Sequence, residues 1–175
     1  MNQLELELQP ATPSYRLIPL SQGQFAKVSP EDYDYLMKFK WHAQWDSRGQ
    51  NFRAHRIEMK PKQHGVYMHR QIMGVTVREI EVDHWNHDAL DNQRGNLRLA
   101  TRKQNNCNQR IRKDNTSGHK GVSWNSRHKR WCAQVNIDGK RVLIGRFKSI
   151  DDAVSAYEDV ARRVHGEFFC KERVA

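Results

Sequence analysis

Residues 82–101 read VDHWNHDALDNQRGNLRLAT. The segment EIEVDH, residues 79–84, predicts a strand that ends in an Asp-His pair, Asp83 and His84. A loop rich in Asn, Asp and Gly follows, and the NLRLAT segment predicts a second short strand. A structural loop needs turn-forming residues but no Asp-His pair ahead of it, so the pair indicates chemistry as well as a turn.

A helix is predicted directly after this hairpin. Thr101 is a suitable N-cap for the segment TRKQNNCNQRIRK, which spans residues 101–113. The order is then strand, loop, strand and helix. Asn105 falls near the first turn of this helix and faces the hairpin, so we expect it to approach Asp83 and His84.

These three side chains fit the hydrolysis of a phosphodiester bond. That reaction needs a base that activates water and a cation that offsets negative charge. A neutral His84 imidazole suits the base, and the oxygens of Asp83 and Asn105 suit a hard cation such as Mg²⁺. Asn96 begins the second strand, where it can hydrogen-bond across the loop and fix the position of His84.

Two other interpretations of this stretch stay open at this point. The residues also suit an Asn- and Asp-rich hairpin that carries an incidental surface histidine. A zinc site through His84 and His87 is a weaker alternative, because Cys107 is the only cysteine nearby and a closed zinc site needs four ligands.

The charge of the chain favours a polyanionic partner. The 175 residues carry a formal net charge of +10, and thirteen Lys or Arg residues lie between positions 102 and 148, against only Asp114 and Asp138. An excess concentrated on one folded segment favours phosphate binding over an ordinary solvated surface. Nucleic acid is therefore the expected partner.

Other sequence features bear on the compartment of the protein. No apolar run approaches the length of a membrane-spanning helix, and the first residues lack the apolar region of a signal peptide. We therefore expect an intracellular, cytoplasmic protein with no membrane partner. Cys107, Cys132 and Cys170 are odd in number and widely spaced, which indicates neither a disulfide framework nor paired zinc ligands.

The first part of the chain predicts a small mixed α/β scaffold after a loose tail at residues 1–14. A helix is expected over residues 30–41, with Ser29 as N-cap and Pro30 as its first residue. Trp41, Trp45 and Phe52 are expected in the core rather than in a base-stacking surface. The expected strands are YRLIPL, QFAKV, NFRAHRI and GVYMHRQIM.

The last part of the chain follows a turn-rich linker at residues 114–117 and predicts an antiparallel sheet covered by one helix. Apolar and polar residues alternate over residues 131–137, and Asp138-Gly139 is a strong hairpin turn before a return strand. Ser149 then opens a helix, in a capping box with Asp152, and Gly166 ends it. The helix covers the apolar face of the sheet, which leaves the polar face open.

Residues 67–108 resemble the HNH endonucleases of the phage and intron homing type, which share the ββα-metal (His-Me finger) fold. The resemblance rests on YMHRQIMG and on the ordered motifs DH, LDN, NLR and QNN. It implies that Asp83 and Asn105 bind a divalent metal, Mg²⁺ or Mn²⁺, that His84 is the general base, and that Asn96 positions it. Asn105 stands where the motif has its last histidine, a common variation in the homing subgroup.

The same resemblance extends to neighbouring residues. His69 and Arg70 fall where the family has a recurrent His-Arg pair, and both phosphate contact and a scaffold role stay open for them. Residues 15–42 also resemble the N-terminal segment of the homing subgroup. The resemblance therefore places a nuclease domain with its scaffold at residues 15–113.

Residues 118–170 resemble the DNA-binding domain of the plant Apetala-two/ethylene-response-factor class, which is a three-stranded antiparallel sheet backed by one helix. The resemblance rests on KGV, RW, AQV, LIGRF, AVSAYEDVAR and HGE. In that class the sheet lies in the major groove of DNA, which agrees with the open polar face. Ser123 and Leu143 replace an Arg and a Trp that contact DNA there, so the plant target sequence is not implied.

DNA contacts are expected from the polar face and from the first hairpin turn of this domain. The turn residues grip phosphates, which positions the protein without reading sequence. The expected contact residues are Lys120, Gln134, Asn136 and Arg141 on the sheet side, and Arg127, Lys129 and Arg130 in the turn. Residues 171–175 are expected to form a C-terminal tail.

Together these features predict an α+β protein with two modules, a ββα-metal nuclease and a sheet-and-helix DNA-binding domain. The expected activity is metal-dependent cleavage of double-stranded DNA by an endonuclease of the homing type, in a bacterial or phage-infected cell and with a monomer favoured. The main alternative is a non-catalytic, sequence-specific DNA-binding transcriptional regulator. An RNA-binding protein is less favoured, because the sheet lacks an array of exposed aromatic residues that could stack unpaired bases.

Overall fold

The computed structural model describes residues 14–47, 49–59, 62–108, 111 and 114–170. The expected tails therefore lie outside the described residues, apart from Ser14. The chain divides into two compact units, Met1–Leu99 and Ala100–Ala175. Both contain strands and helices, so the predicted α+β class is confirmed, whereas the ββα-metal module and the predicted domain limits stay predictions.

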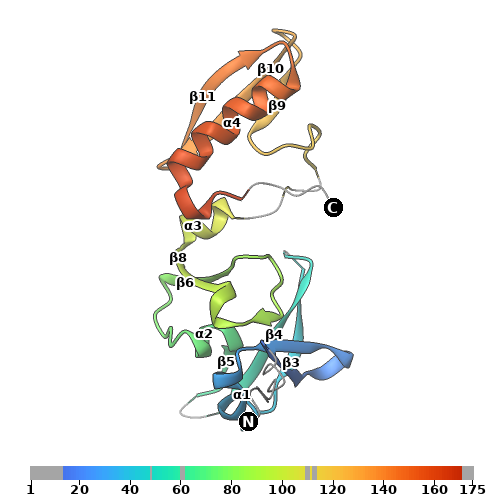
Figure 1. The fold of residues 1–175 in the computed structure, drawn as a ribbon, viewed down its shortest axis with the longest axis vertical. Coiled ribbons are helices and arrows are strands. Elements are labelled where there is room, and N and C mark those ends of the chain that lie inside the picture. Colours follow the sequence, from blue (N-terminus) through green and yellow to red (C-terminus); the bar gives the residue numbers. More distant parts are fainter. Residues whose placement is uncertain (1–13, 48, 60–61, 109–110, 112–113, 171–175) are drawn as a thin grey trace, which may run out of the picture. The chain divides into compact units, whose positions relative to one another are not determined.

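Small sheets and two short helices build the first unit (Figure 1). Its strands pair in the orders β1-β2-β7 and β3-β4-β5, and β6 pairs with β8. The contact between β2 and β7 is parallel, and the other strands of these two three-stranded sheets run antiparallel. The elements are β1 Arg16–Pro19, β2 Phe25–Val28, α1 Pro30–Leu36, β3 His42–Asp46, β4 Asn51–Glu58, β5 His64–Tyr67, α2 Met68–Ile72, β6 Ile80–His84, β7 Asp91–Asn92 and β8 Leu97–Thr101.

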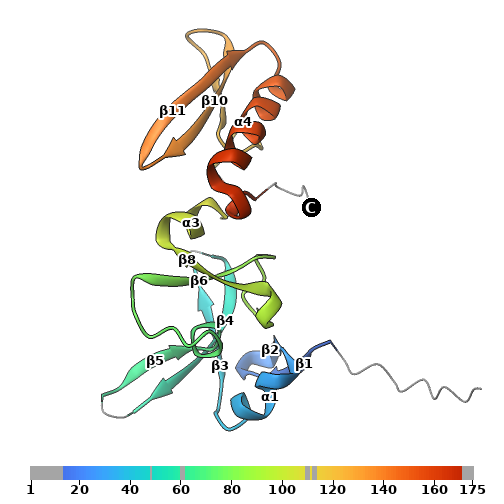
Figure 2. The same ribbon diagram turned by 60° about the vertical axis from the view of Figure 1, so that its left-hand side comes forward.

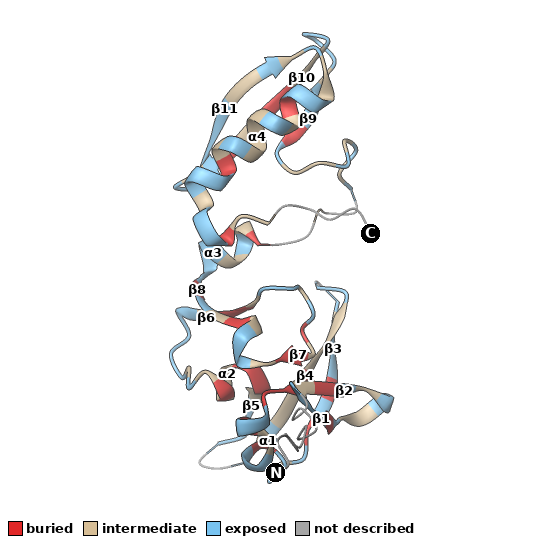
Figure 3. Cartoon of the chain, viewed as in Figure 1, coloured by how far each residue is buried: buried red, intermediate tan, exposed pale blue. Residues whose placement is uncertain are grey.

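One apolar core joins these elements. Buried segments of β2, β4, α2 and β6 meet in it (Figure 3). Their core residues include Val28, Ala54, Met68, Ile72 and Val82. Strands this short bury too little apolar area to be stable alone, so each depends on the shared core. The core therefore fixes β6, which carries Asp83 and His84.

The scaffold differs from its prediction in the region of the first helix. Helix α1 ends at Leu36 instead of continuing to Trp41, whose buried indole donates a hydrogen bond to the Leu36 carbonyl oxygen at 2.9 Å. Ser29 occupies the N-cap position, but its hydroxyl accepts from the Arg94 backbone N–H instead of capping the helix. Residues 42–46, for which no strand was expected, form β3.

Two further expectations for the scaffold were wrong. The segment GVYMHRQIM was expected to be a strand throughout, but the chain turns into helix α2 at Met68. Trp45 was expected in the core, yet it is 50% exposed and packs edge-on against Phe52, with ring centroids 5.0 Å apart.

The second unit contains the predicted antiparallel sheet, with the strands in the order β11-β10-β9, and helix α4 packs on it (Figure 2). The hairpin between β10 and β11 turns at Asp138 and Gly139, as predicted. The elements are α3 Arg102–Cys107, β9 Val122–Asn125, β10 Arg130–Ile137, β11 Lys140–Phe147 and α4 Ile150–His165. No helix in the described part of the chain is long and apolar enough to cross a membrane.

Helix caps in this unit follow the sequence closely. Thr101 forms a capping box with Gln104 at the start of α3. Ser149 caps α4 by accepting from the Asp151 backbone N–H, although the expected box with Asp152 is replaced by this single bond. Gly166 ends α4 with a positive φ of 54°, which only glycine adopts easily.

The register between β10 and β11 shifts between Ala133 and Gln134, which pair with Gly145 and Leu143. The extra residue of this bulge is therefore Ile144, on β11. The alternation predicted along β10 is broken at Cys132 and Ala133, which are consecutive residues and are both buried. The polar positions Gln134 and Asn136 follow this pair.

Gly121 offers a test of packing in the second unit. It has a φ of +63°, and a Cβ there would overlap the Tyr157 ring and lie 2.5 Å from the Gln134 carbonyl oxygen. We expect Gly121→Ala to lower the free energy of unfolding by about 1–3 kcal/mol more than Gly118→Ala, because overpacking adds to the backbone strain. Gly118 is the matched control, with a φ of +74° and nothing within 4 Å. Urea unfolding followed by the Trp131 indole N–H signal measures both, and equal losses would contradict the expectation.

Candidate active site

The loop between β6 and β8 is braced by Asn96. Its side-chain nitrogen donates to the Asn86 side-chain oxygen at 2.9 Å and to the Asp91 carbonyl oxygen at 2.7 Å. Its side-chain oxygen accepts from the Asn86 backbone N–H, and its own carbonyl oxygen accepts from the Trp85 backbone N–H. The expectation that Asn96 bonds across this loop therefore matches the structure, and the residues next to His84 are held in place.

The His84 ring is oriented by Asn92, a residue for which the sequence suggested no role. Nε2 of His84 lies 3.3 Å from Oδ1 of Asn92. An amide oxygen only accepts hydrogen bonds, so Nε2 carries the hydrogen in the neutral ring and the basic lone pair is on Nδ1. Asn92 is fully buried, on the two-residue strand β7, where it pairs with Val28 of β2.

His69 packs behind His84. The two rings meet edge-on, with centroids 5.1 Å apart. The ring of Tyr67 stacks on the His69 ring, with centroids 5.6 Å apart. His69 is 6% exposed. These contacts make it a packing partner of His84 in the structure.

Both histidines are held in the neutral form. Burial is the largest cause that lowers the pKa of His69 well below its usual value, and the neighbouring His84, Arg53 and Arg70 lower it further. Burial also lowers the pKa of His84, against the opposing effect of the Asn92 hydrogen bond. His84 is therefore ready to accept a proton at neutral pH, as a general base must be.

Asp83 is buried beside an arginine from the paired strand. Nε and Nη2 of Arg98 lie 2.8 and 2.7 Å from the same carboxylate oxygen, Oδ2. The side chains of Asp83 and Arg98 are 7% and 14% exposed. This pair holds the Asp83 carboxylate in a fixed orientation. Arg98 is a second functional candidate that the sequence did not single out.

The structure brings Asp83, His84 and Asn96 together in the first unit, whereas Asn105 lies on α3 of the second unit. The approach of Asn105 to the Asp-His pair therefore stays a prediction. No group of three or more His, Cys, Asp or Glu side chains suited to a metal occurs among the described residues. The weaker zinc alternative through His84 and His87 gains no support from this.

Arg70 is engaged in the scaffold. Its guanidinium donates to the carbonyl oxygens of Val77 and Ile80, at 2.6 and 2.7 Å. These bonds hold the segment that leads from α2 into β6. The sequence left both phosphate contact and a scaffold role open for Arg70, and these contacts match the scaffold role.

The expected DNA-contact residues of the second unit are only partly grouped. Asn136 and Arg141 are exposed register partners on β10 and β11. Arg127 and Lys129 are exposed in the turn between β9 and β10, while Gln134 and Arg130 are half-buried. Lys120 donates instead to the Cys107 carbonyl oxygen at 3.2 Å, which ties it to the end of α3. Binding of DNA by these residues stays a prediction.

The buried neutral His69 leads to an expectation about acid stability. Its folded-state pKa lies below the unfolded value near 6.5, so below that pH the unfolded chain binds a proton that the folded chain does not. The free energy of unfolding therefore falls as the pH is lowered below about 6.5, by at most about 1.4 kcal/mol per pH unit for one group. We expect His69→Phe, which keeps an aromatic ring, to reduce this slope.

Urea unfolding at neutral and at mildly acidic pH measures the slope, with the Trp41 indole N–H signal reporting on the first unit. His128→Phe is the matched control, because His128 is exposed in a turn of the second unit. A His69→Phe slope equal to that of the wild type would mean that the acid sensitivity comes from other groups.

Comparisons with known proteins give two viral relatives. The chain is 36% identical over 89 residues to protein 3.8 of Escherichia phage T7, an alignment that covers 50% of this chain and 71% of that protein. It is 28% identical over 160 residues to a protein named as an uncharacterized HNH endonuclease of Acanthamoeba polyphaga mimivirus, which covers 91% of this chain and 81% of that protein.

No protein-family profile matches the chain, and no solved structure matches it. The similarity to the mimivirus protein extends over most of the chain and supports the resemblance to HNH nucleases. The resemblance of residues 118–170 to the plant DNA-binding domain gains no such support and stays a prediction.

Proposed function

We propose that this chain, which belongs to the same protein family as protein 3.8 of Escherichia phage T7, is a metal-dependent HNH endonuclease that hydrolyses phosphodiester bonds of DNA. The observation that carries the proposal is the neutral His84 ring, oriented by Asn92 beside the buried Asp83 carboxylate. The similarity to the mimivirus protein named as an HNH endonuclease supports it.

In the proposed mechanism His84 takes a proton from the attacking water through Nδ1. The hydrogen bond from Nε2 to Asn92 selects this tautomer, and the edge-on ring of His69 limits rotation of the imidazole. Because His69 stays neutral, it adds no positive charge that would weaken His84 as a base. Fixed placement of the base lowers the barrier further, since little reorganisation is needed.

The donor set suits Mg²⁺ or Mn²⁺. Asp83 supplies a buried carboxylate and Asn105 is proposed to supply an amide oxygen, both of which are hard oxygen ligands. A bound divalent cation would offset charge on the scissile phosphate and on the departing 3′ oxygen. Since Arg98 already neutralises much of the Asp83 charge, we expect substrate phosphate oxygens to complete the site, as they commonly do for Mg²⁺.

We assign binding of double-stranded DNA to the second unit. Asn136 and Arg141 would face the groove, and the exposed Arg127 and Lys129 would contact phosphates. We also propose that the nuclease is of the homing type and that it acts as a monomer, with one site per chain. One site per chain favours nicking of a single strand.

The test is cleavage of supercoiled plasmid by the purified protein, with Mg²⁺ and with EDTA. We expect nicked product that requires the metal. DNA binding without cleavage, on substrates that include the native locus, would overturn the nuclease and favour the non-catalytic regulator. Linear product formed without a nicked intermediate would instead contradict the single-strand outcome.

A further inference from the structure

Trp85 lies next to His84 in the chain and is held with most of its surface in solvent. It is 58% exposed. Its backbone N–H donates to the Asn96 carbonyl oxygen at 2.9 Å, and the Arg98 guanidinium lies over its ring, 4.7 Å from the ring centroid. Arg98 is at the same time bound to Asp83. The indole is therefore fixed to the candidate site by both its backbone and its ring.

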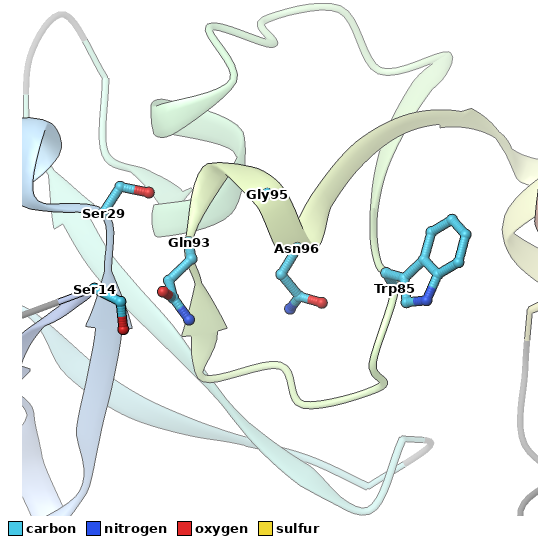
Figure 4. A pocket seen from close by; sticks show the side chains of 6 residues that line it. All are labelled: Ser14, Ser29, Trp85, Gln93, Gly95 and Asn96. Carbon is cyan, nitrogen blue, oxygen red and sulfur yellow. The ribbon is translucent and has the colours of Figure 1, made fainter.

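A cavity of about 620 Å³ opens beside this ring. Figure 4 shows Trp85 on one side of it and Gln93 and Asn96 projecting between Trp85 and the two serines. Gly95 leaves open space, because a Cβ there would meet nothing within 4 Å. The volume falls in the range of small-molecule sites. The lining residues are Ser14, Ser29, Trp85, Gln93, Gly95 and Asn96.

We propose that Trp85 is a stacking platform for an unpaired nucleobase of the DNA strand, received in this cavity. This inference rests on the proposed nuclease and names the form of substrate that the site takes, a locally unpaired strand. Arg98 covers one face of the indole, and the large exposed fraction leaves the other face to a base. A ring held in place before binding loses little conformational entropy when a base stacks on it.

Position and chemistry both favour a base over an apolar partner. Trp85 and Asp83 both contact the Arg98 guanidinium, so a base on the indole belongs to a nucleotide close to the carboxylate proposed to bind the metal. The cavity is lined by hydroxyl and amide side chains, whose polar groups suit the polar edge of a base better than an apolar surface. Single exposed aromatic residues are ordinary on protein surfaces, and Trp45 of the same unit, 50% exposed, is such a residue.

The experiment uses the full chain with His84→Ala, in EDTA, so that DNA stays intact. Two probes of one sequence are compared, a single strand that contains 2-aminopurine and the perfect duplex. Adding Trp85→Ala is expected to abolish quenching of the 2-aminopurine and to weaken single-strand binding by about 5- to 150-fold, the equivalent of one stacked base. Duplex affinity is expected to stay unchanged, and Trp85→Phe is expected to restore part of the single-strand affinity.

Trp45→Ala in the same background is the matched control and should leave both affinities unchanged. The Trp41 indole N–H signal shows that each variant is folded. The proposal is overturned if Trp85→Ala behaves like Trp45→Ala, or if the His84→Ala protein binds no single-stranded DNA. Failure of the wild type to cleave plasmid would overturn the proposed nuclease activity but not the stacking proposal, since stacking on Trp85 is measured without cleavage.

Discussion

Replacing His84 with alanine is expected to reduce metal-dependent plasmid cleavage by about 10²- to 10⁴-fold, the usual contribution of a general base. Among the residues proposed for the site, His84 is the only one whose side chain is placed to take a proton from water beside Asp83, and the variant lacks it. DNA binding should persist, because the proposed DNA contacts of the second unit are untouched. The measurement is the rate of nicking at saturating protein, together with DNA affinity by gel shift.

His87→Asn is the matched control for this substitution. His87 lies in the same loop with a positive φ of 63°, a conformation that Asn tolerates better than most residues. The control also tests the zinc alternative, which requires His87 as a ligand. Full cleavage by His84→Ala would remove His84 as the base, and loss of cleavage in His87→Asn together with bound zinc would revive the zinc interpretation.

Local signals in the sequence were enough to predict much of this architecture. The turn at Asp138 and Gly139, the strand that follows it and the caps at Thr101 and Ser149 depend on neighbouring residues alone. The hairpin that carries Asp83 and His84 was likewise readable, because its strands and its polar loop are contiguous in sequence. The Asp-His motif and the loop-bracing residue Asn96 were recognised for the same reason.

Features that depend on distant contacts were missed. Asn92 lies on a strand of two residues, too short to show any periodicity, and it is placed by pairing with Val28 far earlier in the chain. Arg98 acts through Asp83 on the neighbouring strand, which composition alone does not reveal. The chain also turns from strand to helix at Met68, where burial of Met68 and Ile72 in the shared core outweighs the extended preference of the local sequence.

Arg98→Leu is expected to lower the free energy of unfolding of the first unit by about 3–5 kcal/mol, because it removes the guanidinium that is paired with the buried Asp83 carboxylate. The comparison that isolates this cause is Asp83→Leu combined with Arg98→Leu. Removing both charges leaves no unpaired ion, so the double variant should be more stable than Arg98→Leu alone. Urea unfolding in EDTA, followed by the Trp41 indole N–H signal, measures all three proteins.

Arg78→Leu is the control, since Arg78 is exposed in the same unit and its loss should change stability by no more than about 0.5 kcal/mol. A double variant as unstable as Arg98→Leu would show that Arg98 stabilises the unit through its packing on Trp85 and not through the ion pair.

The double variant also separates the structural contribution of Asp83 from its proposed role in cleavage. It is expected to be folded and yet unable to cleave plasmid, because the carboxylate proposed to bind the metal is gone. Cleavage by that protein would exclude Asp83 as a ligand, whatever its contribution to stability.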